Sequence, residues 1–467
     1  MKRFNKYSAV IFLVLVMFMQ VVFAAPASSV TNIRFSQKAE SVRIVFDVDS
    51  VPAYEVKQEA NGTKIILNMP NTMNKANLTS LPIKDTAIKS IDFAMDTKNN
   101  FSAIITLNRN AVYKVNTLKN PNRVYIDIIK NYDQKIVEQI APGIQHITLM
   151  RGNEKGMITA HVLDIDLKKG YQIKPALANG MIAGRQAVSG IAKDNNAIAA
   201  INASYFASNG EILGLTKIDS TIVSTAGLAR SALGIAEDGT PFIGTVDYQG
   251  SVKLRDGEIL PISGVNSERG ENAAVLYNQY YDKTTKTNIY GREYVIKDNE
   301  VIAINPNNSA LKKGEVVLSV HGSSADRLAN LQVGQDCVIT EDLGEPWNKA
   351  KDILGVGPLL VQNGSVYLTT KIEQFGPDVA SGRAPRTAVG LTKDGRVLLA
   401  VIDGRQSHSI GYTLLELALF MQEMGAVSAV NFDGGGSSEM VIGKDIINSP
   451  SDGGERKVGS ALVVLGK

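Results

Sequence analysis

The chain changes character at Pro142-Gly143, and this change limits what it can fold into. Before that point, apolar and polar residues alternate with the period of two that half-buried strands show. After it, glycine becomes frequent, and strand-like and helix-like runs follow one another. The 467 residues also exceed what one ordinary core accommodates. The sequence therefore predicts a multidomain protein with an N-terminal all-β sandwich and a C-terminal mixed α/β (α+β) domain.

The first 24 residues have the features of a secretory signal peptide. Basic residues at the start precede an unbroken apolar run from Ala9 to Met19, and Val22-Phe23-Ala24 fits a cleavage site. The alternative is an uncleaved anchor, because apolar character resumes after Gln20. We therefore expect a secreted or cell-envelope protein, either extracellular or periplasmic.

Residues 30–130 show the strand period most clearly. In the run Val42–Val48 apolar side chains alternate with charged ones, and Asn-Gly and Asn-Asn pairs supply turns. No amphipathic helix interrupts these runs, so we expect a small β-sandwich. Residues 131–143 are mostly polar and end in Pro-Gly, which predicts a linker before a second domain at 144–467.

Composition argues against several classes of function. The 49 basic and 46 acidic residues leave a net charge of +3 without a basic run, so nucleic acid is not an expected partner. The single cysteine, Cys337, rules out an intrachain disulfide, and we expect it to be buried. The four histidines lack zinc-ligand spacing. We therefore expect no metal and no cofactor, although an ion held by carboxylates alone stays open.

The segment 396–433 has the pattern strand, loop, helix, strand. Val397–Ile402 leads into Asp403, Thr413–Glu416 is a capping box, and Ala429–Phe432 leads into Asp433. A right-handed βαβ unit would bring both aspartates to one edge of a parallel sheet, about 5–10 Å apart, the spacing of carboxylate pairs that cleave glycosides. A third strand between them would lengthen this distance and weaken a two-carboxylate mechanism.

A glycine-rich turn follows, in the run Asp433-Gly434-Gly435-Gly436-Ser437-Ser438. Successive glycines allow backbone N–H groups to converge on an anion. The alternative is a tight turn that feeds the strand expected at Met440–Ile442. Ser437 does not lie in a Gly-x-Ser-x-Gly motif, which argues against a serine hydrolase.

Three arginines are candidate ligands for phosphate, because the guanidinium group matches phosphate oxygens with paired donors. Arg383 and Arg386 lie in the loop before the strand expected at 388–391, and the alternative is that both are solvated surface charges. Arg405 follows Asp403, and it either pairs with this aspartate or joins the site. His408, in the same loop, is expected to be solvated.

The N-terminal segment resembles the AMIN domain. The resemblance lies in Ile33-Arg34-Phe35, in the strand Val42–Asp47 and in the closing segment Asn122–Asp127. It implies a β-sandwich that targets the protein to peptidoglycan or another envelope polysaccharide.

The segment from roughly residue 140 to the end resembles the phosphodiester glycosidase family. The family's motifs occur here in the same order, at Ala199–Phe206, Pro385–Gly390, Val401–Arg405 and Asn431–Ser438. The resemblance implies a hydrolase that cleaves the anomeric C–O bond of sugar-1-phosphodiesters, with N-acetylglucosamine the expected sugar. The expected catalytic residues are Asp433 and Asp403. The expected substrate-binding residues are Asn202, Arg383, Arg386, Arg405, Gly434, Gly435, Gly436 and Ser437.

This reaction suits the residue types present. Cleavage expels a phosphate monoester, whose second pKa of about 6 lets it leave without a strong proton donor. Arginines can neutralise its charge, and a carboxylate can stabilise the developing oxocarbenium ion. Two alternatives stay open. One is a phosphodiesterase that cuts the P–O bond, which usually needs a metal, and the other is a non-catalytic protein that binds envelope polymers.

Overall fold

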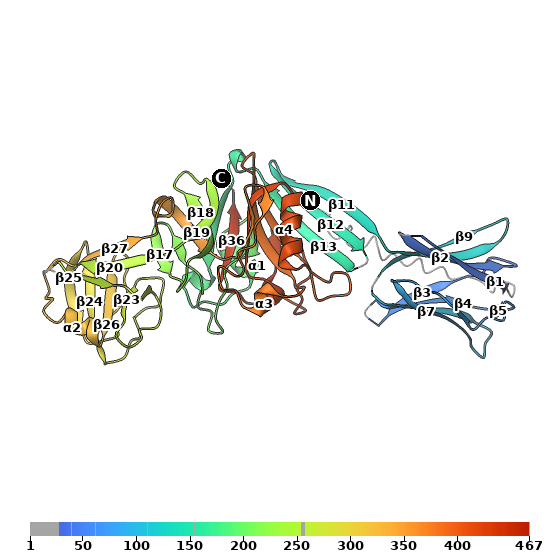
Figure 1. Ribbon diagram of the computed structural model, residues 1–467, viewed down its shortest axis with the longest axis horizontal. Helices are drawn as coiled ribbons and strands as arrows, with labels where there is room; N and C mark the ends of the chain where they lie inside the picture. The colour runs from blue at the N-terminus through green and yellow to red at the C-terminus, as the bar shows by residue number, and fades with distance from the viewer. Residues whose placement is uncertain are drawn as a thin grey trace, which may run out of the picture. The chain divides into compact units, whose positions relative to one another are not determined.

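The computed structural model describes residues 28–466 except 39, 61, 110, 154 and 254–256, so the predicted signal peptide lies outside the described residues. Contacts divide the chain into two compact units (Figure 1). The first runs to Tyr132 and includes Gly152–Lys155, and the second comprises Asp133–Arg151 and everything from Gly156 onward. Within the described residues, no helix combines the length and the apolar character needed to cross a membrane.

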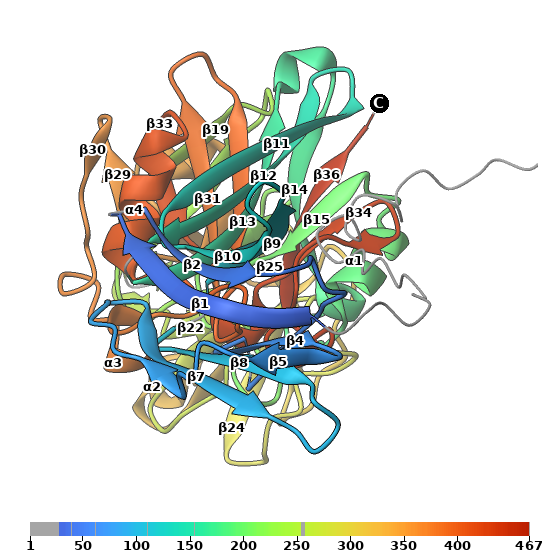
Figure 2. The same cartoon turned by 90° about the vertical axis from the view of Figure 1, so that its right-hand side faces the viewer.

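The first unit is a sandwich of two five-stranded sheets, with strand orders β5-β1-β2-β10-β9 and β3-β4-β8-β7-β6. Figure 2 shows β1 and β2 facing β7 and β8. Phe46 of one sheet packs edge-on against Phe93 and Phe101 of the other, with ring centroids 6.1 and 5.8 Å apart. The predicted N-terminal β-sandwich is therefore confirmed. Its strands are β1 (Ser28–Gln37), β2 (Ser41–Val48), β3 (Glu55–Glu59), β4 (Lys64–Met69), β5 (Thr72–Asn74), β6 (Ser80–Leu81), β7 (Ile88–Met95), β8 (Phe101–Leu107), β9 (Val112–Leu118) and β10 (Arg123–Ile129).

The centre of the second unit is a stack of two sheets between two helices. An eight-stranded sheet, in the order β11-β12-β13-β32-β31-β33-β29-β30, packs against a five-stranded sheet in the order β14-β36-β15-β34-β35. Leu399 and Val430 of the first share a core with Ile201 and Leu462 of the second. Helix α4 covers the opposite face of the eight-stranded sheet, and α1 covers the opposite face of the five-stranded sheet.

The elements of this stack are bounded as follows. The larger sheet contains β11 (Tyr132–Ala141), β12 (Ile144–Asn153), β13 (Gly156–Ile165), β29 (Leu359–Gln362), β30 (Ser365–Val366), β31 (Arg386–Thr392), β32 (Val397–Ile402) and β33 (Ala426–Asn431). The smaller sheet contains β14 (Gln172–Leu177), β15 (Ala199–Asn202), β34 (Met440–Ile442), β35 (Asp445–Ile446) and β36 (Ser460–Leu465). The helices are α1 (Val188–Asp194), α3 (Pro377–Ala380) and α4 (Leu414–Glu423).

Residues 216–355 form further sheets beside this stack. The nearest has the order β17-β16-β28-β18-β19, and the other two have the orders β21-β20-β27 and β22-β23-β26-β24-β25. Cys337 lies in their shared core with 1% of its surface exposed, as predicted. Their elements are β16 (Thr216–Ile218), β17 (Thr221–Ser224), β18 (Arg230–Ala236), β19 (Pro241–Val246), β20 (Gln249–Lys253), β21 (Ile259–Pro261), β22 (Gly264–Val265), β23 (Ala274–Tyr277), β24 (Gly291–Lys297), β25 (Glu300–Asn305), β26 (Val316–His321), α2 (Ser323–Arg327), β27 (Val338–Asp342) and β28 (Ala350–Gly355).

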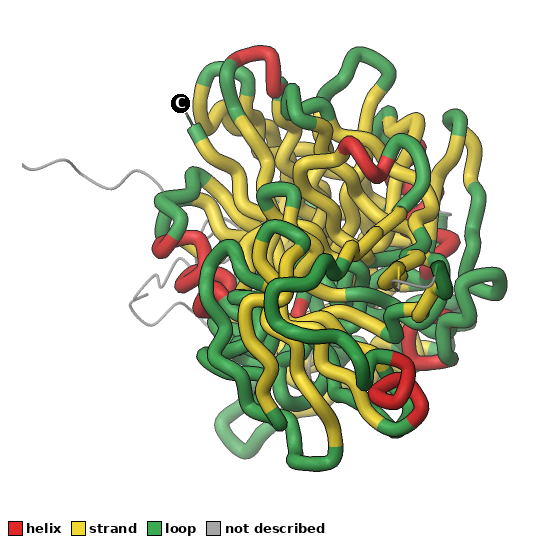
Figure 3. Tube along the Cα trace, turned by 90° about the vertical axis from the view of Figure 1, so that its left-hand side faces the viewer, coloured by secondary structure: helices red, strands yellow, loops and turns green. Residues whose placement is uncertain are grey.

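The second unit is richer in strands than the predicted mixed α/β domain. Over both units together, strands account for 49% of the residues and helices for 9%, and Figure 3 shows that helices are few and short. Apart from α4, no α-helix in the described part of the chain exceeds seven residues. Most apolar runs are short and pair antiparallel, so two packed sheets rather than layers of helices bury them.

The capping box at Thr413 and Glu416 is confirmed, and Gly425 follows α4 with a left-handed φ of +94°. The predicted neighbours β32 and β33, however, do not pair with each other. Both pair antiparallel with β31, so they run parallel with β31 between them. The intervening strand doubles the separation of the two strand axes from about 4.8 Å, the value for adjacent strands, to about 10 Å.

The predicted linker is also different in the structure. Residues Tyr132–Ala141 form β11, the edge strand of the eight-stranded sheet. The alternation of residues such as Ile136 and Ile140 with polar neighbours fits an edge strand that is solvated on one face. The polar composition therefore marked a sheet edge rather than an irregular connection.

This edge strand decides where a stable fragment can begin. We expect a fragment of residues 131–467 to unfold cooperatively, and a fragment of 144–467 to melt several degrees lower and to aggregate, because losing β11 exposes the edge of β12. Thermal unfolding followed by circular dichroism, with light scattering, compares the two. Equal midpoints and equal solubility would show that β11 does not support the sheet.

Candidate active site

Asp433 lies where the two central sheets meet. It follows β33, and its backbone N–H donates to the Ala203 carbonyl at 2.9 Å. The Asn202 side chain donates from Nδ2 to the Asp433 carbonyl at 2.6 Å. Its Oδ1 accepts from Thr387 Oγ1 at 2.7 Å and from the Glu439 N–H at 3.1 Å. Asn202 is fully buried, so it positions Asp433 and is not exposed for the substrate contact that we expected.

The three glycines after Asp433 form a tight turn rather than an open anion nest. The Gly434 N–H donates to Asp433 Oδ1, and the Gly435 N–H donates to the Pro385 carbonyl, both at 2.9 Å. Gly435 has a left-handed φ of +63°. A side chain at Gly436 would collide with Arg456. Two of the expected amide donors are thus engaged within the protein. The turn therefore orients the Asp433 carboxylate, and its glycines leave room for arginine side chains.

The carboxyl group of Asp433 has a perturbed acidity. Desolvation raises its pKa to about 6, although hydrogen bonds from Ser437 and Gly434 and the charge of Arg456 act in the opposite direction. The residue keeps some exposed surface, so the group is reachable despite its desolvated surroundings. A carboxylate that changes charge near neutral pH is typical of catalytic groups.

Two arginines lie at this turn. Arg405 is exposed and left-handed, with φ +59°, and among the described residues it has no hydrogen bond or ion pair. Its Nη1 lies 3.3 Å from the position that a Cβ on Gly435 would occupy. Arg456 pairs with Asp452 at 2.6 Å and reaches Ser437 Oγ at 3.5 Å. The sequence motifs predicted Arg405 as a site residue, whereas Arg456 was not among the predicted residues.

The other two predicted arginines are occupied elsewhere. Arg386 is 3% exposed, and its guanidinium donates to the carbonyls of Tyr412, Val379 and Gly382 at 3.0–3.1 Å. Arg383 donates to the Gly411 carbonyl and pairs with Glu416. Neither has donors directed at the Asp433 turn. We expected Arg386 to contact phosphate. In the structure it instead holds the 379–382 loop through its hydrogen bonds.

Asp403, the second predicted catalytic residue, is buried and hydrogen-bonded within the protein. Its side chain is 2% exposed, and Oδ1 accepts from Asn448 Nδ2 at 3.2 Å and from the Ser449 N–H at 2.9 Å. His408 Nε2 lies 2.9 Å from Oδ2, so this histidine is anchored rather than freely solvated as expected. The alternative in which Arg405 pairs with Asp403 is not seen among the described contacts. Asp403 thus anchors the loop that carries Arg405.

A buried glutamate, Glu439, which is paired with the exposed Glu455, was missed in the sequence. Glu439 is 1% exposed, and burial, then the hydrogen bond and charge of Glu455, raise its pKa well above the ordinary range. Desolvation also raises the pKa of Glu455, but hydrogen bonds from Glu439 and Ser189 outweigh it and lower the pKa overall. Glu439 therefore keeps its proton at neutral pH. In the sequence, Glu439 lies directly after the Ser-Ser pair and before an apolar strand, and this position could have indicated a buried acid.

Metal ligands do not gather in the described part of the chain. No group of three or more histidine, cysteine or acidic side chains there lies close enough to hold an ion.

Comparison with known proteins assigns both segments. Residues 269–465 match the phosphodiester glycosidase family, and residues 32–108 match the AMIN domain. Both resemblances predicted from the motifs are confirmed.

Individual relatives are similar over limited lengths. The mouse N-acetylglucosamine-1-phosphodiester alpha-N-acetylglucosaminidase is 30% identical over 148 residues, which cover 28% of this chain and 28% of the mouse protein. The human enzyme is 34% identical over 103 residues, or 20% of each chain. The chain thus matches less than a third of the length of these relatives.

One solved structure shares the fold over most of the chain. A hypothetical protein from Synechocystis has a TM-score of 0.64 and 20% identity, and the match covers 95% of this chain and 82% of that one.

The raised pKa of Asp433 has a consequence for stability. The folded state holds this proton more tightly than the unfolded state, so stability falls as pH rises from about 4 through 6. An asparagine side chain does not ionise and carries no such penalty, so we expect Asp433→Asn to raise the free energy of unfolding at pH 8 by about 1–3 kcal/mol. The gain should shrink towards pH 4. Urea unfolding at both pH values measures it.

A matched control uses the exposed Asp394, whose pKa is lowered by a hydrogen bond from Thr392. Asp394→Asn should give no gain at pH 8. An Asp433→Asn variant that is no more stable than the wild type at pH 8 would contradict the assigned environment of Asp433.

Proposed function

We propose that this chain, in which an AMIN segment precedes a phosphodiester glycosidase segment, is an exported hydrolase that cleaves the anomeric C–O bond of sugar-1-phosphodiesters. The observation that carries the proposal is the Asp433 carboxyl group of raised pKa beside the unpaired Arg405. The names of the mammalian relatives point to N-acetylglucosamine as the sugar.

The residues suit this reaction in three ways. The leaving group is a phosphate monoester with a second pKa of about 6, so it needs charge neutralisation more than a proton. Arg405, and Arg456 beside it, can supply that charge at the glycine turn. Ionised Asp433 can stabilise the oxocarbenium ion, as nucleophile or as base for water. Because Asp433 must be ionised, activity should rise with pH around 6.

The N-terminal sandwich gives the enzyme its proposed location. An AMIN segment suggests attachment to peptidoglycan or another envelope polysaccharide, which would hold the glycosidase segment near polymeric substrates. We therefore propose phosphodiester-linked envelope glycans or exopolysaccharide as the natural substrate class.

Product analysis tests the bond that is cleaved. Full-length protein is incubated with an N-acetylglucosamine-1-phosphodiester, and the expected products are the free sugar and a phosphate monoester. Asp433→Asn should lower turnover by at least about a hundredfold, since it removes a major transition-state charge. Sugar 1-phosphate as the product would instead indicate P–O cleavage. Polymer binding without any release of sugar would indicate a non-catalytic protein.

A second test addresses Arg405. Arg405→Ala should lower kcat/KM on the phosphodiester by about 10–100-fold, the effect of losing one charge-assisted hydrogen bond. Arg292→Ala, at an exposed arginine on β24, is the matched control and should leave kcat/KM within about twofold. An equal loss for Arg405→Ala on an uncharged aryl glycoside would show that Arg405 does not act on the phosphate.

A further inference from the structure

A cavity of about 420 Å³ lies beside the strand end that carries Asp433. Its wall includes Tyr205, Phe375, Arg230, Asp378 and two leucines, Leu213 and Leu228. Volumes of 300–1,000 Å³ are typical of sites for small molecules. None of the functional residues discussed above lines it, so its use is a separate question.

Its aromatic and apolar side chains are partly exposed. The rings of Tyr205 and Phe375 lie 5.6 Å apart between centroids, with an angle of 47° between their planes. Leu213 and Leu228 are 53% and 40% exposed. Aromatic faces carry partial negative charge, which suits the C–H groups on the apolar face of a pyranose ring.

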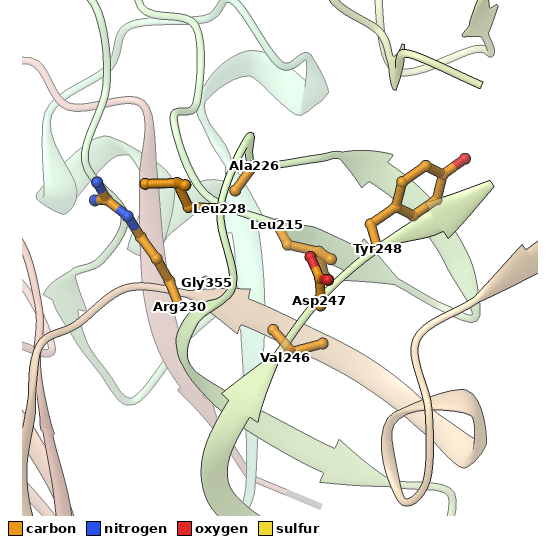
Figure 4. Close-up of a pocket in the computed structure, with 8 residues that line it drawn as sticks. All are labelled: Leu215, Ala226, Leu228, Arg230, Val246, Asp247, Tyr248 and Gly355. Atoms are coloured by element: carbon orange, nitrogen blue, oxygen red, sulfur yellow. The ribbon is translucent and has the colours of Figure 1, made fainter. Parts of the chain in front are cut away.

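Free polar groups stand beside these rings. The Arg230 guanidinium lies 4.3 Å from the centre of the Phe375 ring, and among the described residues it has no hydrogen bond or ion pair. Figure 4 shows its side chain pointing away from Asp247, the acid in the adjoining recess. Asp378 likewise has no hydrogen bond or ion pair in the described part of the chain. Unpaired donors and acceptors around an aromatic face can bind sugar hydroxyl and amide groups.

Hydrogen bonds connect this cavity to the catalytic strand. Tyr205 Oη accepts from Asn431 Nδ2 at 2.8 Å and donates to the Gly357 carbonyl at 2.9 Å. Asn431 is the last residue of β33, two positions before Asp433. Val379 also lines the cavity, and Arg386 donates a hydrogen bond to its carbonyl at 3.1 Å. The cavity and the carboxyl group are therefore fixed by the same strand end.

We propose that this cavity binds the pyranose ring of the substrate and sets the specificity for the sugar. The inference rests on the proposed function. The ring packs against Phe375 and Tyr205, Arg230 and Asp378 bind its polar substituents, and the anomeric carbon faces Asp433. The phosphate then lies towards Arg405.

Kinetics and sugar binding test the assignment in the full-length protein. Phe375→Ala should raise KM for the phosphodiester and the inhibition constant of free N-acetylglucosamine together, each about tenfold, while kcat stays within about threefold. A tenfold change corresponds to about 1.4 kcal/mol, the scale of one aromatic contact. Phe375→Tyr should restore both constants. Tyr290→Ala, at an aromatic residue that is 72% exposed outside the cavity, is the matched control.

Failure of this inference is distinguishable from failure of the proposed function. An active enzyme in which Phe375→Ala, shown by circular dichroism to be folded, leaves KM and the inhibition constant unchanged would overturn the sugar site alone. If the wild type cleaves no phosphodiester, saturation-transfer NMR with N-acetylglucosamine still tests whether the cavity binds the sugar. A signal that Phe375→Ala abolishes supports the cavity as a sugar site, and no signal from the wild type overturns it.

Discussion

The site depends on one buried amide, that of Asn202. Its three side-chain hydrogen bonds reach Asp433, Thr387 and Glu439, which belong to three segments that are distant in sequence. A fully buried amide is stable only when its donors and acceptors are engaged, so the strand ends are held in one register. The position of the Asp433 carboxyl group follows from this arrangement, because Asn202 and Ala203 fix the backbone of Asp433 on both sides.

The arginines of the second unit have two different roles: some hold loops in place, and others are free to bind a ligand. Arg386 directs its guanidinium donors at backbone carbonyls, and Arg383 at a carbonyl and the capping glutamate. Arg386 is buried and Arg383 partly buried, and cations engaged in this way hold loops in place rather than bind a ligand. Arg405 and Arg230 have no charged partner within the described structure, and they stand at the carboxyl group and at the cavity. The unpaired charges therefore mark where an anionic, hydroxyl-rich molecule would be accommodated.

Local patterns predicted the local features of this fold. The alternation around Val42–Val48 and the capping box at Thr413 were visible because the signals lie within a few residues of each other. The insertion of β31 between β32 and β33 could not be predicted, because strand pairing depends on the whole sheet. The roles of Arg386 and Arg405 were equally hidden, since a guanidinium group looks the same in sequence whether it is buried or exposed. The sequence also indicated the glycine turn after Asp433, but not the hydrogen bonds that occupy it.

The left-handed backbone of Arg405 has an evolutionary consequence. A non-glycine residue with φ near +60° costs about 1 kcal/mol or more, and glycine would relieve this strain. Glycine would also delete the unpaired charge above Gly435. Selection for thermostability alone would therefore favour loss of this arginine, whereas its retention in a homologue would indicate that the charge is under selection. At position 405, stability thus favours glycine, whereas the proposed activity favours arginine.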